Sequence, residues 1–447
     1  MKDYLRMTRM TTSLALIATA ALLSGCGIIN KKAKSTPTIG DRVSVLVSEL
    51  DIAVDAETAA APMALPAATA NADWAQSGGS PSKLVEHVAL PASVGLAWSS
   101  AIGAGSTKSR RLGGGPVVAG GKVYTIDTVG SVRAHDAATG APVWAARFGD
   151  AKGNENILYG GGVAVDGGRV YATNGFGHVA ALDAATGAVA WTVRPGGPLR
   201  GAPSVADGSI YVISQDNQIF ALKAADGTTA WSAAAALEVA GVFGNGSPAV
   251  DRGTVVAGFS SGELNAYRYE NGRQVWQDAL SRTSISMGVG SLSDIDADPV
   301  IANGIVYALG QGGRMVALDL TSGQRVWELN MAGIATPWVA GDWLFAVNDK
   351  AQLIAVQRLT GKIRWINQLP RWLKEEKKDG QINYFGPVLA GDRLIVAGSN
   401  GALINIDPAT GAVQSQTSAG GGVRFQPVVA GGSLYLMTEE GRLLAYR

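Results

Sequence analysis

The sequence predicts an all-β protein, an eight-bladed β-propeller of four-stranded antiparallel blades that is closed by pairing of its N- and C-terminal strands. A short hydrophobic hairpin framed by Pro or Gly recurs eight times, at spacings of 38 to 51 residues, which is typical of propeller blades. Most copies end in a strand that carries Trp, and the last copy lacks its fourth strand. The hairpins begin at Pro116, Val163, Pro203, Pro248, Pro299, Pro337, Pro387 and Pro427.

Each repeat places a turn between its third and fourth strands. The clearest copies are Ala134–Trp144 and Ala181–Trp191, both of the form Ala-x-Asp-x-x-Thr-Gly-x-x-x-Trp. Asp and Thr can bond the backbone of their own turn, and Gly supplies the positive φ that a tight hairpin needs. The Trp offers a flat surface for the neighbouring sheet. We therefore expect four aspartates at this position to serve turns: Asp136, Asp183, Asp319 and Asp407.

Closure of the ring is predicted from the two chain ends. The eighth repeat stops at Arg447, one strand short, whereas a fourth strand with its Trp stands alone at Leu96–Trp98. Pairing these segments removes the exposed edges of an open sheet. One domain is expected over residues 73–447.

Composition agrees with a turn-rich β protein and excludes several functions. The 447 residues include 59 Gly, 47% are hydrophobic and only 16% are charged, with no long helical periodicity. The formal net charge of +1 gives no basic face for nucleic acid. His87, His135 and His178 are dispersed without metal-ligand spacing, so neither a metal nor a cofactor is expected.

Residues 1–25 are predicted to be a lipoprotein signal peptide. Basic residues precede an apolar stretch, Ser13–Leu23, which is too short to span a membrane. Leu-Ser-Gly-Cys follows and ends at Cys26, the single cysteine of the chain. This order predicts that Cys26 becomes the lipidated N-terminus, with two acyl signals that hold the protein at the outer membrane, on its periplasmic face. The alternative is an incidental thiol in an ordinary secretory signal.

Residues 26–72 are predicted to be the lipidated Cys and a flexible tether. Three lysines are followed by Ser, Thr and Pro, and residues 56–70 are rich in Ala and Pro. Within this stretch, Arg42–Val47 has the composition of a strand. It could be a docked extra strand or a partner-binding segment.

The Trp-terminated repeats resemble the tryptophan-docking repeat of pyrroloquinoline-quinone propellers, over Trp98–Arg447. Two functional classes carry this repeat: quinoprotein dehydrogenases and the BamB family of the outer-membrane β-barrel assembly machine. The enzyme class implies a Ca²⁺-bound quinone, a catalytic Asp, a nearby Arg and, in many members, a disulfide between adjacent cysteines. With one Cys in the chain, that disulfide is absent.

The second class is favoured by two local matches. The BamB family has a Leu-Ser-Asp-(Val/Ile)-Asp loop before its fifth hairpin, similar to Leu292–Asp296 here, and a Leu-x-Leu-Arg-Gly segment in the preceding loop, similar to Leu237–Gly241. The resemblance implies that Leu237, Val239, Asp294 and Asp296 dock onto BamA. Ala240 replaces the family's Arg. Alternatively, the two aspartates cap their own loop.

The function that we expect from the sequence is a non-catalytic, outer-membrane lipoprotein scaffold. It would bind BamA and other subunits of the assembly machine, and could present strands of unfolded outer-membrane proteins. The connections from Trp276 to Pro299 and from Trp365 to Pro387 are long and emerge on one face, which favours a binding face there; the second contains Trp372, a candidate anchor. The alternatives are a periplasmic quinoprotein dehydrogenase and a propeller with an unrelated partner.

Overall fold

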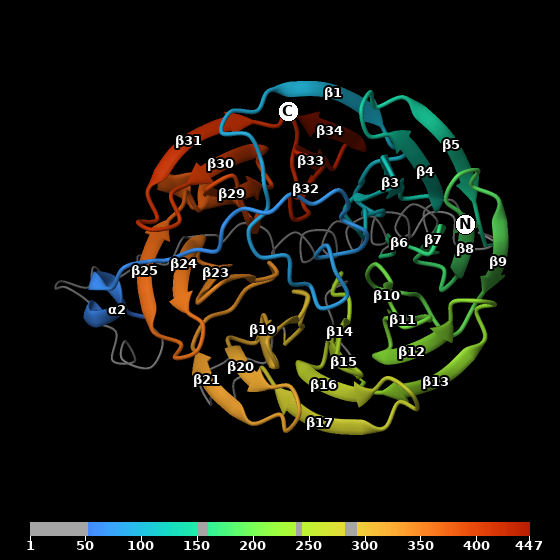
Figure 1. The fold of residues 1–447 in the computed structure, drawn as a ribbon, viewed down its shortest axis with the longest axis horizontal. Coiled ribbons are helices and arrows are strands. Elements are labelled where there is room, and N and C mark those ends of the chain that lie inside the picture. The colour runs from blue at the N-terminus through green and yellow to red at the C-terminus, as the bar shows by residue number, and fades with distance from the viewer. Residues whose placement is uncertain (1–51, 150–159, 238–243, 282–292) are drawn as a thin grey trace, which may run out of the picture. The chain divides into compact units, whose positions relative to one another are not determined.

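The described residues form a ring of eight sheets, each of four antiparallel strands (Figure 1). The computed structural model describes residues 52–149, 160–237, 244–281 and 293–447. In seven blades the strands follow chain order from the centre of the ring outward, and in the eighth the outermost strand comes from the N-terminal side. The predicted fold class is confirmed.

The blades alternate short hydrophobic strands with Gly-rich turns. The first two contain β2 (Val117–Ala119), β3 (Lys122–Ile126), β4 (Ser131–Asp136) and β5 (Pro142–Arg147), then β6 (Val163–Asp166), β7 (Arg169–Thr173), β8 (Val179–Asp183) and β9 (Val189–Val193). The third and fourth contain β10 (Ser204–Ala206), β11 (Ser209–Ile213), β12 (Gln218–Lys223) and β13 (Thr229–Ala234), then β14 (Ala249–Asp251), β15 (Thr254–Gly258), β16 (Glu263–Arg268) and β17 (Gln274–Ala279).

The remaining blades repeat this plan. The fifth and sixth contain β18 (Val300–Ala302), β19 (Ile305–Leu309), β20 (Met315–Asp319) and β21 (Arg325–Leu329), then β22 (Trp338–Ala340), β23 (Trp343–Val347), β24 (Gln352–Gln357) and β25 (Ile363–Gln368). The last two contain β28 (Tyr384–Ala390), β29 (Arg393–Gly398), β30 (Ala402–Ile406) and β31 (Val413–Ser418), then β32 (Val428–Ala430), β33 (Ser433–Met437), β34 (Arg442–Tyr446) and β1 (Leu96–Ala101).

Burial follows the position of each strand in its blade. The middle strands are almost wholly buried between neighbouring blades, as β15 and β29 show at every residue. The outermost strands alternate or are fully exposed, as in β31. The hydrophobic core therefore lies between the faces of adjacent sheets, which is where the Val-, Ile- and Leu-rich segments of the sequence belong.

Seven tryptophans join seven of the eight blades to the blade that follows each of them. Each indole nitrogen donates a hydrogen bond of 2.7 to 3.3 Å to a backbone carbonyl in or beside the turn between the third and fourth strands of the following blade. The ring lies on the glycine of that turn. At Gly187, where φ is +76°, an added β-carbon would be 2.6 Å from the Trp144 ring. The seven are Trp98, Trp144, Trp191, Trp231, Trp276, Trp327 and Trp365.

Blade seven lacks this tryptophan for a topological reason. Ser415 stands on β31 where the other blades place Trp. The next blade has no turn between its third and fourth strands, because β34 ends the chain and β1 comes from far upstream. A tryptophan at position 415 would have no turn to pack on.

The chain ends close the ring as predicted. β1 pairs with β34 in antiparallel register, with Ser99 opposite Leu444. Gly95 and Arg447 exchange two backbone hydrogen bonds of 2.7 and 2.9 Å. Trp98 then bonds the carbonyl of Ala137 in the first blade, at 3.2 Å.

Residues 52–72, the described part of the tether predicted for 26–72, include a segment that contacts the propeller. A short helix, α2 (Ala56–Ala60), lies against β25. The amide of Asp55 bonds the carbonyl of Ile363 at 2.9 Å, and Arg364 donates to the carbonyl of Thr58 at 3.0 Å. Ala/Pro-rich composition predicted a tether because such a segment has little to bury on its own; here the propeller supplies the hydrogen-bond partners. Residues 26–51, including Cys26 and Arg42–Val47, lie outside the described residues.

The connection after β25 forms a small hairpin of its own. It pairs β26 (Trp372–Lys374) with β27 (Asp379–Gln381), joined through a 3-10 turn, η3 (Glu375–Lys377). Arg371 lies over the Trp372 ring at 5.2 Å, and Leu373 is 64% exposed.

Candidate functional site

The loops that precede the innermost strands carry the predicted partner-binding residues. Leu237 lies in the connection from β13 to β14 and is 76% exposed, the most exposed large hydrophobic side chain of the described residues. Val239 and Ala240, from the same connection, lie outside the described residues. Asp294 and Asp296 lie just before β18, in a segment that we call the acidic loop (residues 293–298).

The acidic loop is held by an arginine that the sequence analysis missed. Arg200, in the connection from β9 to β10, is only 1% exposed. Its Nη2 lies 2.5 Å from Oδ1 of Asp294 and 3.3 Å from Oδ1 of Asp296. The sequence does contain a Leu-Arg-Gly segment, Leu199–Gly201. It lies one blade before the loop to which the sequence analysis matched the family's Leu-x-Leu-Arg-Gly segment.

Three connections meet at this ion pair. Nε of Arg200 donates to the carbonyl of Gly244, at 3.4 Å, in the same connection as Leu237. Gly244 has no room for a side chain, because a β-carbon there would be 1.6 Å from Oδ1 of Asp296. Gln311 also donates to the Asp296 carboxylate. Arg200 therefore joins Gly244, at the inner end of the connection that carries Leu237, to the acidic loop.

Burial changes the role expected for Asp294. The sequence analysis expected Asp294 and Asp296 to offer two acceptors to a partner. In the structure the side chain of Asp294 is 1% exposed and that of Asp296 is 12% exposed. Both carboxylates are engaged within the chain, so Asp294 is placed to fix the loop rather than to contact a partner directly.

The same surroundings disturb the ionisation of both carboxylates. Burial, followed by the negative charge of Asp294, raises the pKa of Asp296 to about 7. Burial also raises the pKa of Asp294, although the Arg200 guanidinium opposes this. One buried cation thus faces two buried carboxylates, and removing it would leave their charge uncompensated.

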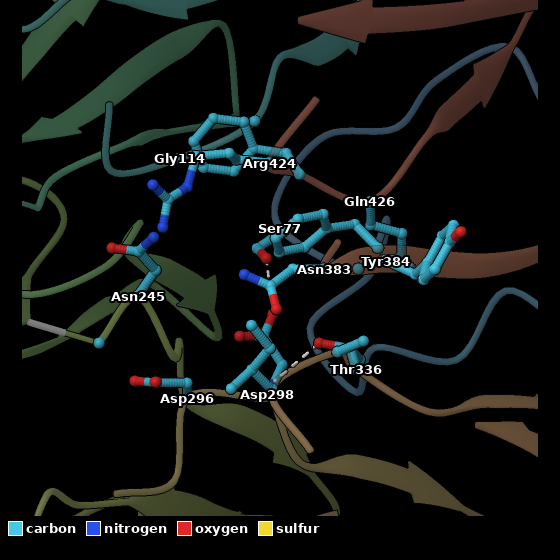
Figure 2. A pocket seen from close by; sticks show the side chains of 18 of the residues that line it. Ser77, Gly114, Asn245, Asp296, Asp298, Thr336, Asn383, Tyr384, Arg424 and Gln426 are labelled. Atoms are coloured by element: carbon cyan, nitrogen blue, oxygen red, sulfur yellow. Dashed lines mark hydrogen bonds between the residues drawn. The ribbon is translucent and has the colours of Figure 1, made fainter. Parts of the chain in front are cut away.

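The third carboxylate of the acidic loop faces the centre of the ring. Asp298 is 5% exposed; it accepts from the Ser77 hydroxyl at 2.6 Å and from the Ser247 amide at 2.7 Å. Its own amide donates to the Thr336 hydroxyl at 3.0 Å. Asp298 therefore ties the start of its strand to neighbouring blades and to the N-terminal segment (Figure 2).

A cavity of about 600 Å³ opens at the centre of the ring. Asp296, Asp298 and Asn245 line one side, Arg424 and Asn383 line others, and Trp74 belongs to its wall (Figure 2). The residues present do not fit a calcium-bound quinone: Asp296 and Asp298 are already engaged by protein groups, and the chain has no second cysteine.

The aspartates of the repeat turns serve those turns, as predicted. Asp136 accepts from the amide and hydroxyl of Thr139, both at 2.8 Å, and these bonds lower the pKa of its carboxyl. Asp183 does the same with Thr186, and Asp319 and Asp407 have equivalent bonds. Across the part of the chain that the structure describes, no three His, Cys, Asp or Glu side chains gather as a metal site would require.

Two of the three histidines are buried within the fold. His87 is 2% exposed; its ring nitrogens lie 2.8 Å from the carbonyl of Pro66 and 3.1 Å from the amide of Asp392. His135 is also buried, next to the last residue of β4. Within the described ranges, no helix has the length and apolar character to cross a bilayer.

These features define a closed eight-bladed propeller with tryptophan-docking repeats and a packed cluster of loops on the face that leads into its innermost strands. Residues 86–159, 128–367 and 371–447 match the family model described as outer membrane protein assembly factor BamB. The chain belongs to this family.

Individual relatives agree with the family match. The chain is 30% identical to the outer membrane protein assembly factor BamB of Salmonella typhimurium over 206 residues, 45% of this chain and 50% of the relative. It is 30% identical to that of Escherichia coli K12 over 202 residues, 44% of this chain and 48% of the relative. These alignments span about half the length of the curated relatives.

Solved structures agree with the fold. The crystal structure of BamB from Moraxella catarrhalis superposes with a TM-score of 0.66 at 20% identity, covering 79% of this chain and all of the other. A europium-containing methanol dehydrogenase also superposes with a TM-score of 0.66, at 15% identity, covering 82% of this chain and 89% of the other. At these identities the superpositions describe the fold alone.

Proposed function

We propose that this protein is a non-catalytic scaffold of the outer-membrane β-barrel assembly machine, held at the outer membrane by a lipid on Cys26. Family membership supports the assembly role. The observation that carries the proposal is the loop cluster: Arg200 holds Gly244 beside the acidic loop, and the connection that contains Gly244 also carries the exposed Leu237.

The partner at this surface is BamA. Leu237 and Val239 alternate in the sequence, so both can point to one side of an extended segment. Burying each fully would contribute about 1.5 to 3 kcal/mol. Asp296, whose side chain is 12% exposed and lines the central cavity, is the proposed acceptor for the partner. Asp294 acts through Arg200, by holding the loop in place. Other subunits and unfolded outer-membrane proteins remain proposed partners.

The experiment separates contact from folding. We expect the double variant Leu237→Ser, Val239→Ser to keep the melting temperature of the parent and to weaken binding to purified BamA at least about tenfold, a loss of roughly 1.4 kcal/mol. Val413→Ser is the matched control, because Val413 is also an exposed aliphatic side chain but lies on β31, the outermost strand of the seventh blade. Unchanged affinity in the double variant would overturn the proposed surface.

The acidic pair is tested separately. Asp294→Ala leaves Arg200 without its closest partner, so we expect both lower stability and weaker BamA binding. Asp296→Ala is expected to weaken binding with a smaller loss of stability. If both variants bind BamA as the parent does, the two aspartates only cap their own loop.

A quinoprotein dehydrogenase is the alternative, and it requires a cofactor. We expect no stoichiometric binding of pyrroloquinoline quinone with Ca²⁺ by equilibrium dialysis, and no dye-linked oxidation of alcohols or sugars. If the protein both binds the quinone stoichiometrically and oxidises alcohols or sugars, the dehydrogenase function replaces the proposed scaffold function.

A further inference from the structure

The N-terminal segment crosses the centre of the ring before the first blade begins, and its residues Trp74, Ser77 and Gly78 line part of the central cavity. We call residues 71–90 the plug. In Figure 1 the chain runs from α2 at the edge of the ring, across its middle, to β1. Trp74 and Val118 exchange two backbone hydrogen bonds of 2.7 and 2.9 Å, and the carbonyl of Pro81 accepts from Val250 at 2.9 Å.

The plug reaches all eight blades. It forms hydrogen bonds to the innermost strand of each: β2, β6, β10, β14, β18, β22, β28 and β32. These strands are far apart in sequence and do not pair with one another in a common sheet. A single segment of about twenty residues thus satisfies backbone groups on seven of the innermost strands, and its Glu86 carbonyl accepts the indole N–H of Trp338 from the eighth, β22.

Buried polar anchors fix the plug in one position. Lys83 is 3% exposed, and its ammonium donates to the Ser204 hydroxyl at 2.9 Å. Gln76 is 4% exposed and forms two hydrogen bonds with the backbone of Val205, at 3.0 and 3.2 Å. Buried polar groups lose free energy if they are left unpaired, so a shifted plug would be penalised at each anchor.

One anchor belongs to the acidic loop. Ser77 in the plug donates to Asp298, which also accepts the amide of Ser247 from the loop before β14. In addition, the amide of Ile301, just after the acidic loop, donates to the carbonyl of Ser82 at 2.9 Å. The acidic loop is therefore held at one end by Arg200 and at the other by the plug.

We propose that the plug is a positioning element for the partner surface: its seating in the channel holds the acidic loop in the conformation that binds BamA. This inference rests on the proposed docking function. Because coupling between two binding events is reciprocal, a bound partner would also hold the plug in place. The segment that leads to Cys26 would then be linked to partner binding through Ser77 and Asp298.

The first test keeps the whole chain intact. Ser77→Ala removes the plug's hydrogen bond to Asp298 without substituting any residue of the docking surface. Glu57→Ala is the matched control, since Glu57 lies in α2 outside the channel and its side chain is 90% exposed. We expect Ser77→Ala to speed hydrogen exchange of the amides of Ile295 and Asp298 and to weaken BamA binding at least about threefold. Exchange and affinity equal to the parent in Ser77→Ala would overturn the proposal.

The second test cuts the plug from the rest of the chain after the protein has folded and measures how fast the plug dissociates. A protease site placed between the exposed residues Ala92 and Ser93 allows the chain to be cut after folding. We expect the cut plug to stay bound through gel filtration and to leave more slowly when BamA is present, by about fivefold or more. Equal release rates with and without BamA would contradict the link.

The two readouts distinguish the underlying proposals. If the uncut parent does not bind BamA, the docking function fails, while hydrogen exchange of the acidic loop in Ser77→Ala still tests whether the plug positions it. If the parent binds BamA and Ser77→Ala leaves both exchange and affinity unchanged, the docking function stands and the positioning role fails.

Discussion

Trp74 of the plug and Trp338 of β22 lie nearly parallel, with ring centroids 6.0 Å apart and an interplanar angle of 14°. Both are almost completely buried. The indole nitrogen of Trp338 donates to the carbonyl of Glu86, again in the plug, at 2.7 Å. The N-terminal segment is therefore part of the hydrophobic core of the propeller.

Replacing Trp74 should destabilise the whole ring. Trp74→Ala removes a fully buried indole and leaves a cavity, so we expect a loss of about 3 to 5 kcal/mol in the free energy of unfolding. Leu373→Ala, at an exposed position, should change it by less than about 0.5 kcal/mol. Urea unfolding followed by tryptophan fluorescence and circular dichroism measures both. Equal stability of Trp74→Ala and the parent would show that the plug is not part of the core.

Closure by the chain ends gives a second prediction. Removing residues 94–101 deletes β1 and exposes the edge of β34, so we expect loss of stability throughout the domain and not only in the last blade. The melting temperature and the cooperativity of thermal unfolding report this. A truncated protein that melts like the parent would count against the observed pairing.

The explanation for the absence of a tryptophan from blade seven can be tested by two substitutions. Ser415→Trp should give no stabilisation beyond about 0.5 kcal/mol, because the next blade offers no turn to pack on. Trp365→Ser, at the equivalent position one blade earlier, should cost about 3 to 5 kcal/mol, since Trp365 is buried and bonds the carbonyl of Pro408. A large gain from Ser415→Trp would mean that another surface receives the ring.

Lipidation at Cys26 is predicted from the sequence. Cys26→Ser removes the thiol that would carry the diacylglyceryl group, so we expect an unprocessed precursor or release from the outer membrane. Intact mass and membrane fractionation measure the two outcomes. Outer-membrane fractionation and intact mass equal to those of the parent, apart from the single atom exchanged, would refute the assignment.

The disturbed carboxyl of Asp296 predicts a pH dependence of stability. Its pKa is raised from 3.8 to about 7, chiefly by burial and then by Asp294, so the folded protein holds this proton at pH values where the unfolded chain has lost it. Its contribution to stability is present at low pH and is lost as the pH rises from about 4 to about 7, by at most about 1.4 kcal/mol per pH unit for one proton.

Asp296→Asn should remove that slope. We expect the free energy of unfolding of the parent to fall relative to that of Asp296→Asn between about pH 4.5 and about pH 7, roughly the limits of the titration. Urea unfolding in matched buffers measures both free energies. Asp379→Asn, at a carboxylate that is 65% exposed, is the control. Parallel profiles for the parent and Asp296→Asn would contradict the prediction.

The sequence by itself determined the ring. Turn chemistry is local, since Asp, Thr and Gly act within a few residues of one another, and this is why the turns at Asp136 and Asp183 could be predicted correctly. The repeat spacing gave eight blades, and the unpaired strand at Leu96 required a partner at the other end of the chain. The tryptophans were recognised as packing surfaces, although only the structure identifies the turn that each one meets.

The tertiary structure decided everything that depends on contacts between distant segments. Arg200 lies 94 residues before Asp294 in the chain, and no local pattern relates one to the other; only the ring places their loops side by side. Residues 52–72 and the plug could not be predicted for the same reason: an Ala-, Pro- and Ser-rich segment has no hydrophobic periodicity of its own, and the groups that bind it lie on strands far away in the chain. The sequence thus determines elements whose stabilising contacts are local or repeated, whereas a site formed by single contacts across the ring exists only once the blades have closed.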